Sequence, residues 1–159
     1  MISKKMQAAF NEQITEELYS SNIYMSMAYH MEGLGYEGCA HWLIKQSDEE
    51  LQHAREMASF VVSRGGKVEM RAIQAVKDEW KNPLQLFQAV YEHECHISQC
   101  INDLLDKARE EGDKAAEEFC WHFVREQVEE EATSGGIVDK LKNNGEGAII
   151  LLDHVMASR

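Results

Sequence analysis

Apolar residues recur at helical spacing along almost the whole chain, and four breaks divide the pattern into five segments. The spacing predicts helices over 3–31, 37–63, 83–111, 114–142 and 146–156. We expect one all-α domain covering 1–159, because this length supports one full hydrophobic core. Glycine, asparagine or proline marks the breaks: Gly33 and Gly35, Gly65-Gly66, Asn82-Pro83, Gly112, and Asn143-Asn144-Gly145.

The lengths of the connections predict how the helices are arranged. Three connections are short, so the helices beside each of them turn back sharply. The segment from Gly65 to Lys81 reaches about 55 Å when extended, whereas a helix of about 28 residues is about 42 Å long. It can therefore cross the length of a four-helix bundle and make the second and third helices parallel. Its apolar residues are expected to pack on the bundle: Val68, Met70, Ile73, Val76 and Trp80.

Each long helix has a glutamate near the middle of its apolar stripe. Helical spacing aligns Glu17, Glu50, Glu94 and Glu130 with the apolar residues of their helices. Arg and Lys are missing from the central parts of these stripes. Four buried carboxylates without counter-charge would cost many kcal/mol, so we expect two divalent metal ions to balance them.

Two further polar residues accompany these acids. His53 follows Glu50 by three residues, so both can reach one metal ion from one helix face. The fourth helix has Gln127 three residues before Glu130, whereas the second helix has the Glu-x-x-His pattern. The two metal positions are therefore expected to have different ligands. Oxygen ligands with one or two nitrogens and no thiolate suit Mn, Fe or Zn, and spacing does not choose among them. Iron is favoured because carboxylate-bridged iron pairs react with oxygen.

Charge and cysteine content exclude other functions. The formal net charge of −12 would repel nucleic-acid phosphate and anionic lipid, so neither nucleic acid nor membrane is an expected partner. No apolar signal core or membrane-spanning run is present in the sequence, and we expect a cytoplasmic protein. Cys39, Cys95, Cys100 and Cys120 form no Cys-x-x-Cys pair and are expected to be buried, reduced thiols.

Other residues are given ordinary structural interpretations. Gly135-Gly136, inside the fourth helix, indicates a kink or close packing. His93 and His96 flank Glu94 away from the centre of the stripe, so surface or interface positions are expected. Four histidines have no ligand partner in the sequence and are assigned no role: His30, His41, His122 and His154.

Several short segments carry a family resemblance in combination: Asn11-Glu12-Gln13, Glu17-Leu18-Tyr19-Ser20-Ser21, Glu49-Glu50 with His53, Tyr91-Glu92-His93-Glu94, Arg125-Glu126-Gln127 with Glu129-Glu130-Glu131, and Gly145-Glu146-Gly147. They resemble the non-haem bacterial ferritins over nearly the whole chain. The resemblance implies a ferritin-like four-helix bundle with one long crossover and a short fifth helix. It also implies a ferroxidase that oxidises Fe(II) with O2 or H2O2 and stores ferric oxyhydroxide mineral inside a twenty-four-subunit homo-oligomeric shell.

The resemblance also implies a ligand set. Glu17, Glu50 and His53 would hold one iron of a di-iron centre, and Glu50 and Glu94 the other. Gln127 stands where such ferritins have a glutamine beside the second iron, which Glu130 can also reach.

Three further roles follow from the same resemblance. Tyr24 matches a tyrosine that hydrogen-bonds near the site, with a core aromatic as the alternative. A third iron site towards the cavity would use Glu49, Glu126, Glu129 and Glu130. Glu117 resembles an acid that lines the three-fold channel of animal heavy chains, and Cys120 replaces the second acid of that channel.

Related classes fit less well. Bacterioferritins have a haem-binding Met where Leu51 follows Glu50, so no haem is expected. A rubrerythrin-like peroxidase would need a Cys-rich iron module and a second Glu-x-x-His. A light-chain type of ferritin would lack the metal ligands. A miniature twelve-subunit ferritin would lack the last helix and would bind metal between subunits.

Overall fold

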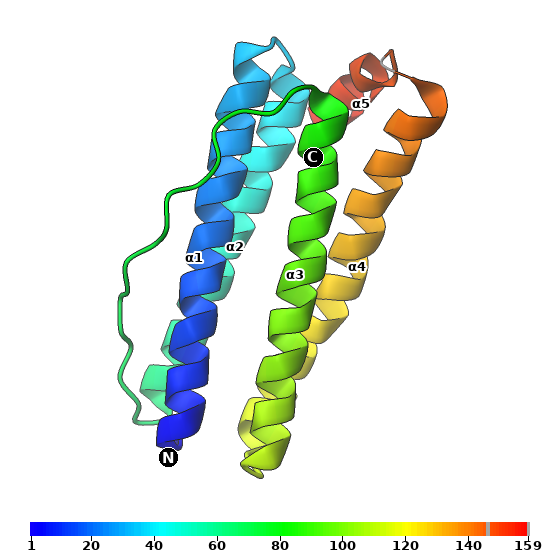
Figure 1. Cartoon of the computed structure of the whole chain (residues 1–159). Coiled ribbons are helices and arrows are strands. Elements are labelled where there is room, and N and C mark those ends of the chain that lie inside the picture. Colours follow the sequence, from blue (N-terminus) through cyan, green and yellow to red (C-terminus); the bar gives the residue numbers. More distant parts are fainter. Residues whose placement is uncertain (146, 159) are drawn as a thin grey trace.

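Four long helices form a bundle in the computed structural model, which describes residues 1–145 and 147–158. Two helical hairpins lie side by side, and a short fifth helix packs at one end (Figure 1). This arrangement confirms the predicted fold class, although the expected start of the last helix, Glu146, lies outside the described residues. The helices are α1 (Lys4–Gly33), α2 (Glu37–Ser63), α3 (Pro83–Glu110), α4 (Lys114–Asn144) and α5 (Ala148–Met156).

The long crossover runs beside α1 from the end of α2 to the start of α3 (Figure 1). Its first part is held by Asn11, whose side-chain amide donates to the Lys67 carbonyl at 3.0 Å and accepts from the Glu69 amide at 2.9 Å. Trp80 is buried at the other end. Met70 is 74% exposed, so the prediction that all apolar crossover residues pack on the bundle is wrong at this position.

Short polar side chains cap three of the helices. Ser3 accepts a hydrogen bond from the Met6 amide, and Asn82 accepts one from the Gln85 amide at 2.8 Å. Asp113 caps α4. Each of these bonds satisfies a backbone donor that the first turn of a helix leaves free.

The glycine pair inside α4 does not interrupt the helix. A side chain at Gly135 would come within 3.3 Å of the Tyr91 ring on α3. Close packing, rather than a kink, therefore accounts for this glycine.

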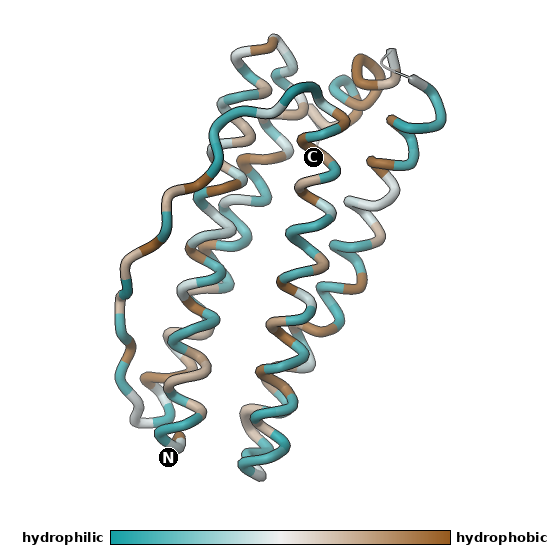
Figure 2. Tube along the Cα trace, in the orientation of Figure 1, coloured by the Kyte–Doolittle hydropathy of each residue, from teal (hydrophilic) through white to brown (hydrophobic). Residues whose placement is uncertain are grey.

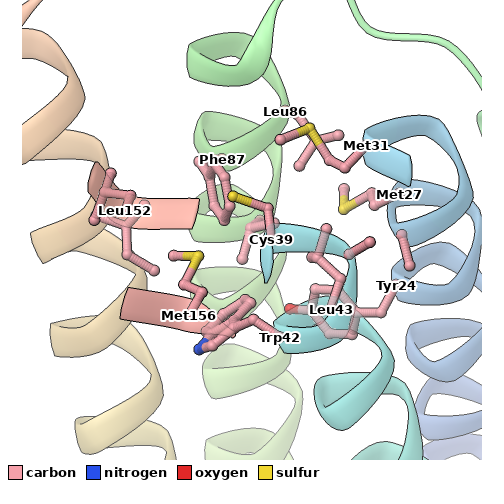
Figure 3. Packing of buried hydrophobic residues seen from close by; sticks show 14 of the residues in the cluster. Tyr24, Met27, Met31, Cys39, Trp42, Leu43, Leu86, Phe87, Leu152 and Met156 are labelled. Atoms are coloured by element: carbon pink, nitrogen blue, oxygen red, sulfur yellow. The ribbon is translucent and has the colours of Figure 1, made fainter. Parts of the chain in front are cut away.

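The apolar core is divided into two clusters along the bundle axis. One cluster, near α5, includes Met31, Leu43 and Phe87 (Figure 3), and the other, near the opposite end, includes Phe10, Met57 and Ile101. Brown and teal positions alternate along every long helix in Figure 2, as one buried face per helix requires. The residues between the two clusters are polar, so the middle of the bundle is where chemistry can occur.

The short α5 docks on α2 by backbone as well as side-chain contacts. Leu152 and Met156 pack near Trp42 (Figure 3), and the Cys39 amide donates to Asp153 Oδ1 at 2.8 Å. A Cβ atom on Gly38 would lie 1.8 Å from the Asp153 carbonyl oxygen, so only glycine fits here. Within the described part of the chain, no helix combines the length and apolar character needed to cross a membrane.

Candidate metal centre

Three carboxylates lie buried at mid-height, one each on α1, α2 and α3. Glu17 and Glu94 are each 1% exposed and Glu50 is 3% exposed. Single ligand atoms of Glu17, Glu50 and His53 all lie within 4.8 Å of one another. The apolar stripes of the helices thus bring carboxylates together inside the bundle, as the sequence spacing predicts.

The partners of Glu17 and Glu50 orient them without neutralising them. Gln13, one turn before Glu17, donates to Glu17 Oε1 at 2.8 Å. His53 Nδ1 lies 3.2 Å from Glu50 Oε2. The second oxygen of Glu17, Oε2, is buried and has no hydrogen-bond partner. A buried carboxylate oxygen in this state is costly, and a cation would satisfy it.

Glu94 occupies the other side of the centre. The Tyr24 hydroxyl donates a hydrogen bond to Glu94 Oε1, and Figure 3 shows the Tyr24 ring among the core residues of α1 and α2. Gln127 Nε2 donates to Glu94 Oε2 at 3.0 Å. Tyr24 and Gln127 are both buried, so they hold the Glu94 carboxylate in one orientation from two helices.

Burial and mutual repulsion disfavour the charged forms of these acids. Burial raises the pKa of Glu17 well above its ordinary value, and the Glu50 carboxylate raises it further. Burial, followed by the charge of Glu94, raises the pKa of Glu50. Burial also raises the pKa of Glu94, although hydrogen bonds from Tyr24 and Gln127 oppose this effect. Divalent cations would displace the protons and restore the charged forms.

Glu130 lies differently from the other three stripe glutamates. It is only half-buried, and its Oε2 accepts a hydrogen bond from Gln46 at 3.0 Å. Gln127 instead takes the fully buried α4 position opposite Glu94. The expectation that all four stripe glutamates are buried is therefore wrong at Glu130, and the centre has three buried carboxylates with a fourth towards its edge.

An acidic depression of about 580 Å³ opens between α2 and α4 beside this centre. His53 connects the two, because its Nδ1 faces Glu50 while its Nε2 lies 3.4 Å from Glu126 Oε2. The other oxygen of Glu126 lies 3.2 Å from His122 Nε2. The residues lining the depression are Glu49, Gln52, His53, Glu56, His122, Glu126, Glu129 and Glu130.

The sequence interpretation gave no role to three residues that contact these acids. Gln13 and Gln46 position Glu17 and Glu130, and His122 contacts Glu126. The four-residue spacings Gln13–Glu17 and His122–Glu126 were available as a signal. Gln46 contacts another helix, so no spacing within α2 would have revealed its partner.

Several expectations about peripheral residues need correction. Cys95 and Cys100 are half-buried rather than buried, although all four cysteines are free thiols. His93 is not a surface residue: it is half-buried, lies 2.8 Å from Ser20 Oγ, and burial lowers its pKa to about 4.

The two residues compared with channel acids do not lie in an open channel in the single chain. Cys120 is buried in the apolar cluster that contains Phe10. Glu117 is bound by Lys114 at 3.0 Å and by Arg109 at 3.3 Å. Cys120 therefore cannot offer its thiol to a passing cation.

Comparison with known proteins decides the family of this bundle. A family model described as a ferritin-like domain matches residues 7–144. The chain belongs to the ferritin family. It is 48% identical to a bacterial non-heme ferritin of Bacteroides fragilis over 159 residues, covering all of both chains. It is 36% identical to a probable bacterial non-heme ferritin-like protein of Haemophilus influenzae, with 92% of this chain and 88% of the relative covered.

Solved ferritin structures agree with this membership. A ferritin of the archaeon Archaeoglobus fulgidus, described as an open pore ferritin, superposes with a TM-score of 0.97 at 42% identity. The match covers 100% of this chain and 99% of that one. The predicted resemblance to ferritins is therefore confirmed along the entire length, including the short α5.

Proposed function

We propose that this ferritin stores iron and oxidises it at a di-iron centre within each chain. Fe(II) is the substrate, and Glu17, Glu50 and His53 bind one ion while Glu50 and Glu94 bind the other. Glu50, between Glu17 and Glu94 in this scheme, contacts both ions. The observation that carries the proposal is the buried, unpartnered Oε2 of Glu17 next to two further buried carboxylates.

The charge and the donor atoms favour this substrate. The contacts described for the three buried acids come from glutamine, tyrosine, histidine and one another, with no lysine or arginine among them. Two divalent ions would supply the missing positive charge. Oxygen donors with one imidazole suit Fe(II). Membership of the ferritin family favours iron over manganese and zinc.

Holding two Fe(II) ions at one site permits a two-electron reaction. Each iron gives up one electron, and the pair reduces O2, with two protons, to H2O2. With H2O2 as the acceptor, the same two electrons and two protons yield two molecules of water. Tyr24 and Gln127 hold Glu94 in place during the change of iron charge.

The acidic depression extends the proposal towards storage. Glu49, Glu126, Glu129 and Glu130 would bind a third iron and receive Fe(III) as it leaves the buried centre. Fe(III) then hydrolyses to ferric oxyhydroxide and releases three protons per iron. Storage in this form requires a hollow homo-oligomeric shell, for which we propose twenty-four subunits as the resemblance implies.

Replacing Glu50 tests the oxidation centre. Metal-free assembled protein is mixed with Fe(II) in air, and the ferric product is followed by stopped-flow absorbance. Because Glu50 would bind both irons, Glu50→Ala should lower the initial rate by roughly 10–100-fold or more. Asp48→Ala, an exposed acid on the same helix, is the matched control and should keep the parent rate.

Particle mass and iron content complete this experiment. Both variants should sediment like the parent assembly, so that a slow rate in Glu50→Ala reports chemistry rather than misfolding. If Glu50→Ala assembled normally and oxidised Fe(II) at the parent rate, the proposed centre would be wrong. A parent protein that remained a small species and gathered no iron would contradict storage.

A further inference from the structure

A second cluster of metal-binding side chains lies across the groove between α1 and α3. Glu16 on α1 contacts His96 on α3, with Glu16 Oε2 and His96 Nε2 3.3 Å apart. Cys100 Sγ lies 3.6 Å from the same ring nitrogen. One ligand atom from each residue lies within 4.8 Å of the others. Carboxylate, imidazole and thiol groups therefore converge on one point at the surface.

We propose that Glu16, His96 and Cys100 form a mononuclear site for a borderline-soft divalent cation of the Zn²⁺ type. Water would occupy the fourth position. The site is separate from the di-iron centre, which has no sulfur ligand. Its sulfur ligand sets its preference, because thiolate and imidazole together favour Zn²⁺ and Co²⁺ over hard, oxygen-preferring cations.

The helical spacing explains how α3 supplies two of the ligands. His96 and Cys100 are four residues apart, so their side chains lie one above the other on one face of the helix. Glu16 comes from the neighbouring α1 and approaches from the opposite side of the groove. Its neighbour Glu17 points inward, because consecutive helical residues are rotated by about 100°.

The distances agree with tetrahedral coordination. Metal–sulfur bonds of about 2.3 Å and metal–nitrogen bonds of about 2.05 Å place sulfur and nitrogen about 3.6 Å apart at tetrahedral angles. Metal–oxygen bonds of about 2.1 Å place nitrogen and oxygen about 3.4 Å apart. The corresponding distances here are 3.6 Å and 3.3 Å. Little movement of these side chains would be needed to admit the ion.

Hydrogen bonding alone does not account for this arrangement as well as a cation does. A neutral imidazole nitrogen carries at most one proton, so a donating His96 Nε2 has only one hydrogen bond to divide between Glu16 Oε2 and Cys100 Sγ. An ion between the three atoms would contact all of them together. The His96 side chain is 57% exposed and that of Glu16 is 41% exposed, so dissolved ions can reach the site.

The local charge also favours a cation. Glu12, Asp103 and Lys107 line the depression next to Glu16 and Cys100. Lys107 is 3.9 Å from Glu12 and so is engaged in an ion pair. The carboxylates of Glu16 and Asp103 remain to attract a divalent ion.

Cobalt(II) absorbance tests the proposal directly, because a Co²⁺–thiolate bond gives a near-ultraviolet charge-transfer band that oxygen and nitrogen ligands do not give. Metal-free, reduced, assembled protein is titrated with CoCl2. The intensity of the band should reach a plateau that corresponds to one thiolate-bound Co²⁺ per chain, while Co²⁺ bound to the carboxylates gives no such band. Excess Zn²⁺ should abolish the band by displacement. Cys100→Ser should eliminate the band, whereas Cys95→Ser, a half-buried cysteine on the same helix, should retain it.

Two further variants keep the test decisive if Cys100→Ser assembles poorly. His96→Gln should weaken Co²⁺ binding by roughly 10–100-fold or more while leaving all cysteines present. Glu50→Ala should leave the band intact, since it alters only the di-iron centre. Absence of the band in the parent protein, its persistence in Cys100→Ser, or its loss in Glu50→Ala would overturn the proposal.

Discussion

The two sides of the bundle use different pairs of helices to present different ligand chemistry. Between α2 and α4, carboxylates surround the acidic depression, and His53 connects them to the buried centre. Between α1 and α3, one carboxylate, one imidazole and one thiol meet at the surface. The backbones of α1 and α3 approach each other closely, whereas α2 and α4 stand further apart. The wider side therefore accommodates a row of acids, and the narrower side only one small cluster.

Glu16 and Glu17 show how little sequence separates the two environments. They are adjacent, yet Glu17 is buried among carboxylates while Glu16 faces His96 in the outer groove. One step along a helix changes the direction of a side chain by about 100°. Helical geometry alone can therefore assign neighbouring acids to separate sites.

The largest expected effect is a loss of Fe(II) oxidation, which should follow from a substitution on the α2–α4 side but not from one on the α1–α3 side. His53→Ala removes the imidazole between Glu50 and Glu126 and should lower the initial rate of Fe(II) oxidation by roughly 10–100-fold. The Co²⁺–thiolate band should be unchanged in this variant. Cys100→Ser should show the reverse pattern, with oxidation within roughly twofold of the parent, because independent sites couple by only a few tenths of a kcal/mol. Equal losses of both signals in either variant would contradict the separation.

Removing the Tyr24 hydroxyl tests the buried centre in the absence of metal. Tyr24→Phe deprives Glu94 of a hydrogen-bond donor, and a buried group left unsatisfied costs about 1–3 kcal/mol of unfolding free energy. Urea unfolding of the metal-free protein measures this loss. Tyr29→Phe, an exposed tyrosine on the same helix, should change stability by no more than about 0.5 kcal/mol. Equal effects of the two variants would show that the bond to Glu94 contributes little.

The pH dependence of stability distinguishes buried from exposed acids. Burial raises the pKa values of Glu17, Glu50 and Glu94 above the ordinary value near 4.5, so the native state retains protons that the unfolded state releases. This contribution to stability is fully present below the ordinary pKa and is lost as pH rises through the raised values. The expected slope is at most about 1.4 kcal/mol per pH unit for each such proton.

Thermal unfolding of metal-free protein between acidic and neutral pH measures this slope. Glu50→Gln should flatten it, and saturating Zn²⁺ should reverse it, because the metal replaces the retained protons. Asp48→Asn supplies the exposed-acid control. Acids with lowered pKa values, such as Asp113 beside Arg64, contribute an opposite slope in every variant. A slope that Glu50→Gln left unchanged would therefore contradict the predicted proton retention.

The smallest effect concerns thiol reactivity. Burial raises the pKa of Cys39 and of Cys120 to about 12 and that of Cys100 to about 11. Because Cys39 and Cys120 are also inaccessible to the reagent, iodoacetamide should modify them more slowly than the half-buried Cys95 and Cys100. Zn²⁺ should then slow the modification of Cys100 selectively. Peptide mass spectrometry gives the rate for each cysteine. Equal protection of Cys95 and Cys100 by Zn²⁺ would indicate a general effect on the protein rather than a bound ion.

Much of the fold could be predicted because the buried face and the ends of a helix are visible in its own sequence. Apolar spacing, caps such as Asn82 and Asp113, and one long connection between α2 and α3 were sufficient for the bundle and its crossover. Met70 was misjudged because an apolar residue in an extended segment carries no periodicity that shows which side faces the bundle.

The candidate centre was predictable only in part, because spacing within one helix does not show how neighbouring helices are placed against it. Glu17, Glu50 and Glu94 stand out because charged residues interrupt apolar stripes, and their burial follows from spacing; iron binding by them stays a prediction. Gln127 and Glu130 are one helical turn apart on one stripe, so spacing could not decide which is more deeply buried. The Glu16–His96–Cys100 cluster depends on the register of α1 against α3, which no single helix encodes.

The packing of the C-terminal helix α5 on the bundle depends on the absence of a side chain at Gly38. Nine residues are too few for a helix to persist in water by itself, so α5 keeps its shape only while it packs on α2 and α4. One added methyl group at Gly38 would collide with the Asp153 carbonyl and dislodge that segment. The tail would then fray while the middle of the bundle, around the buried carboxylates, kept its amide protons protected from solvent exchange.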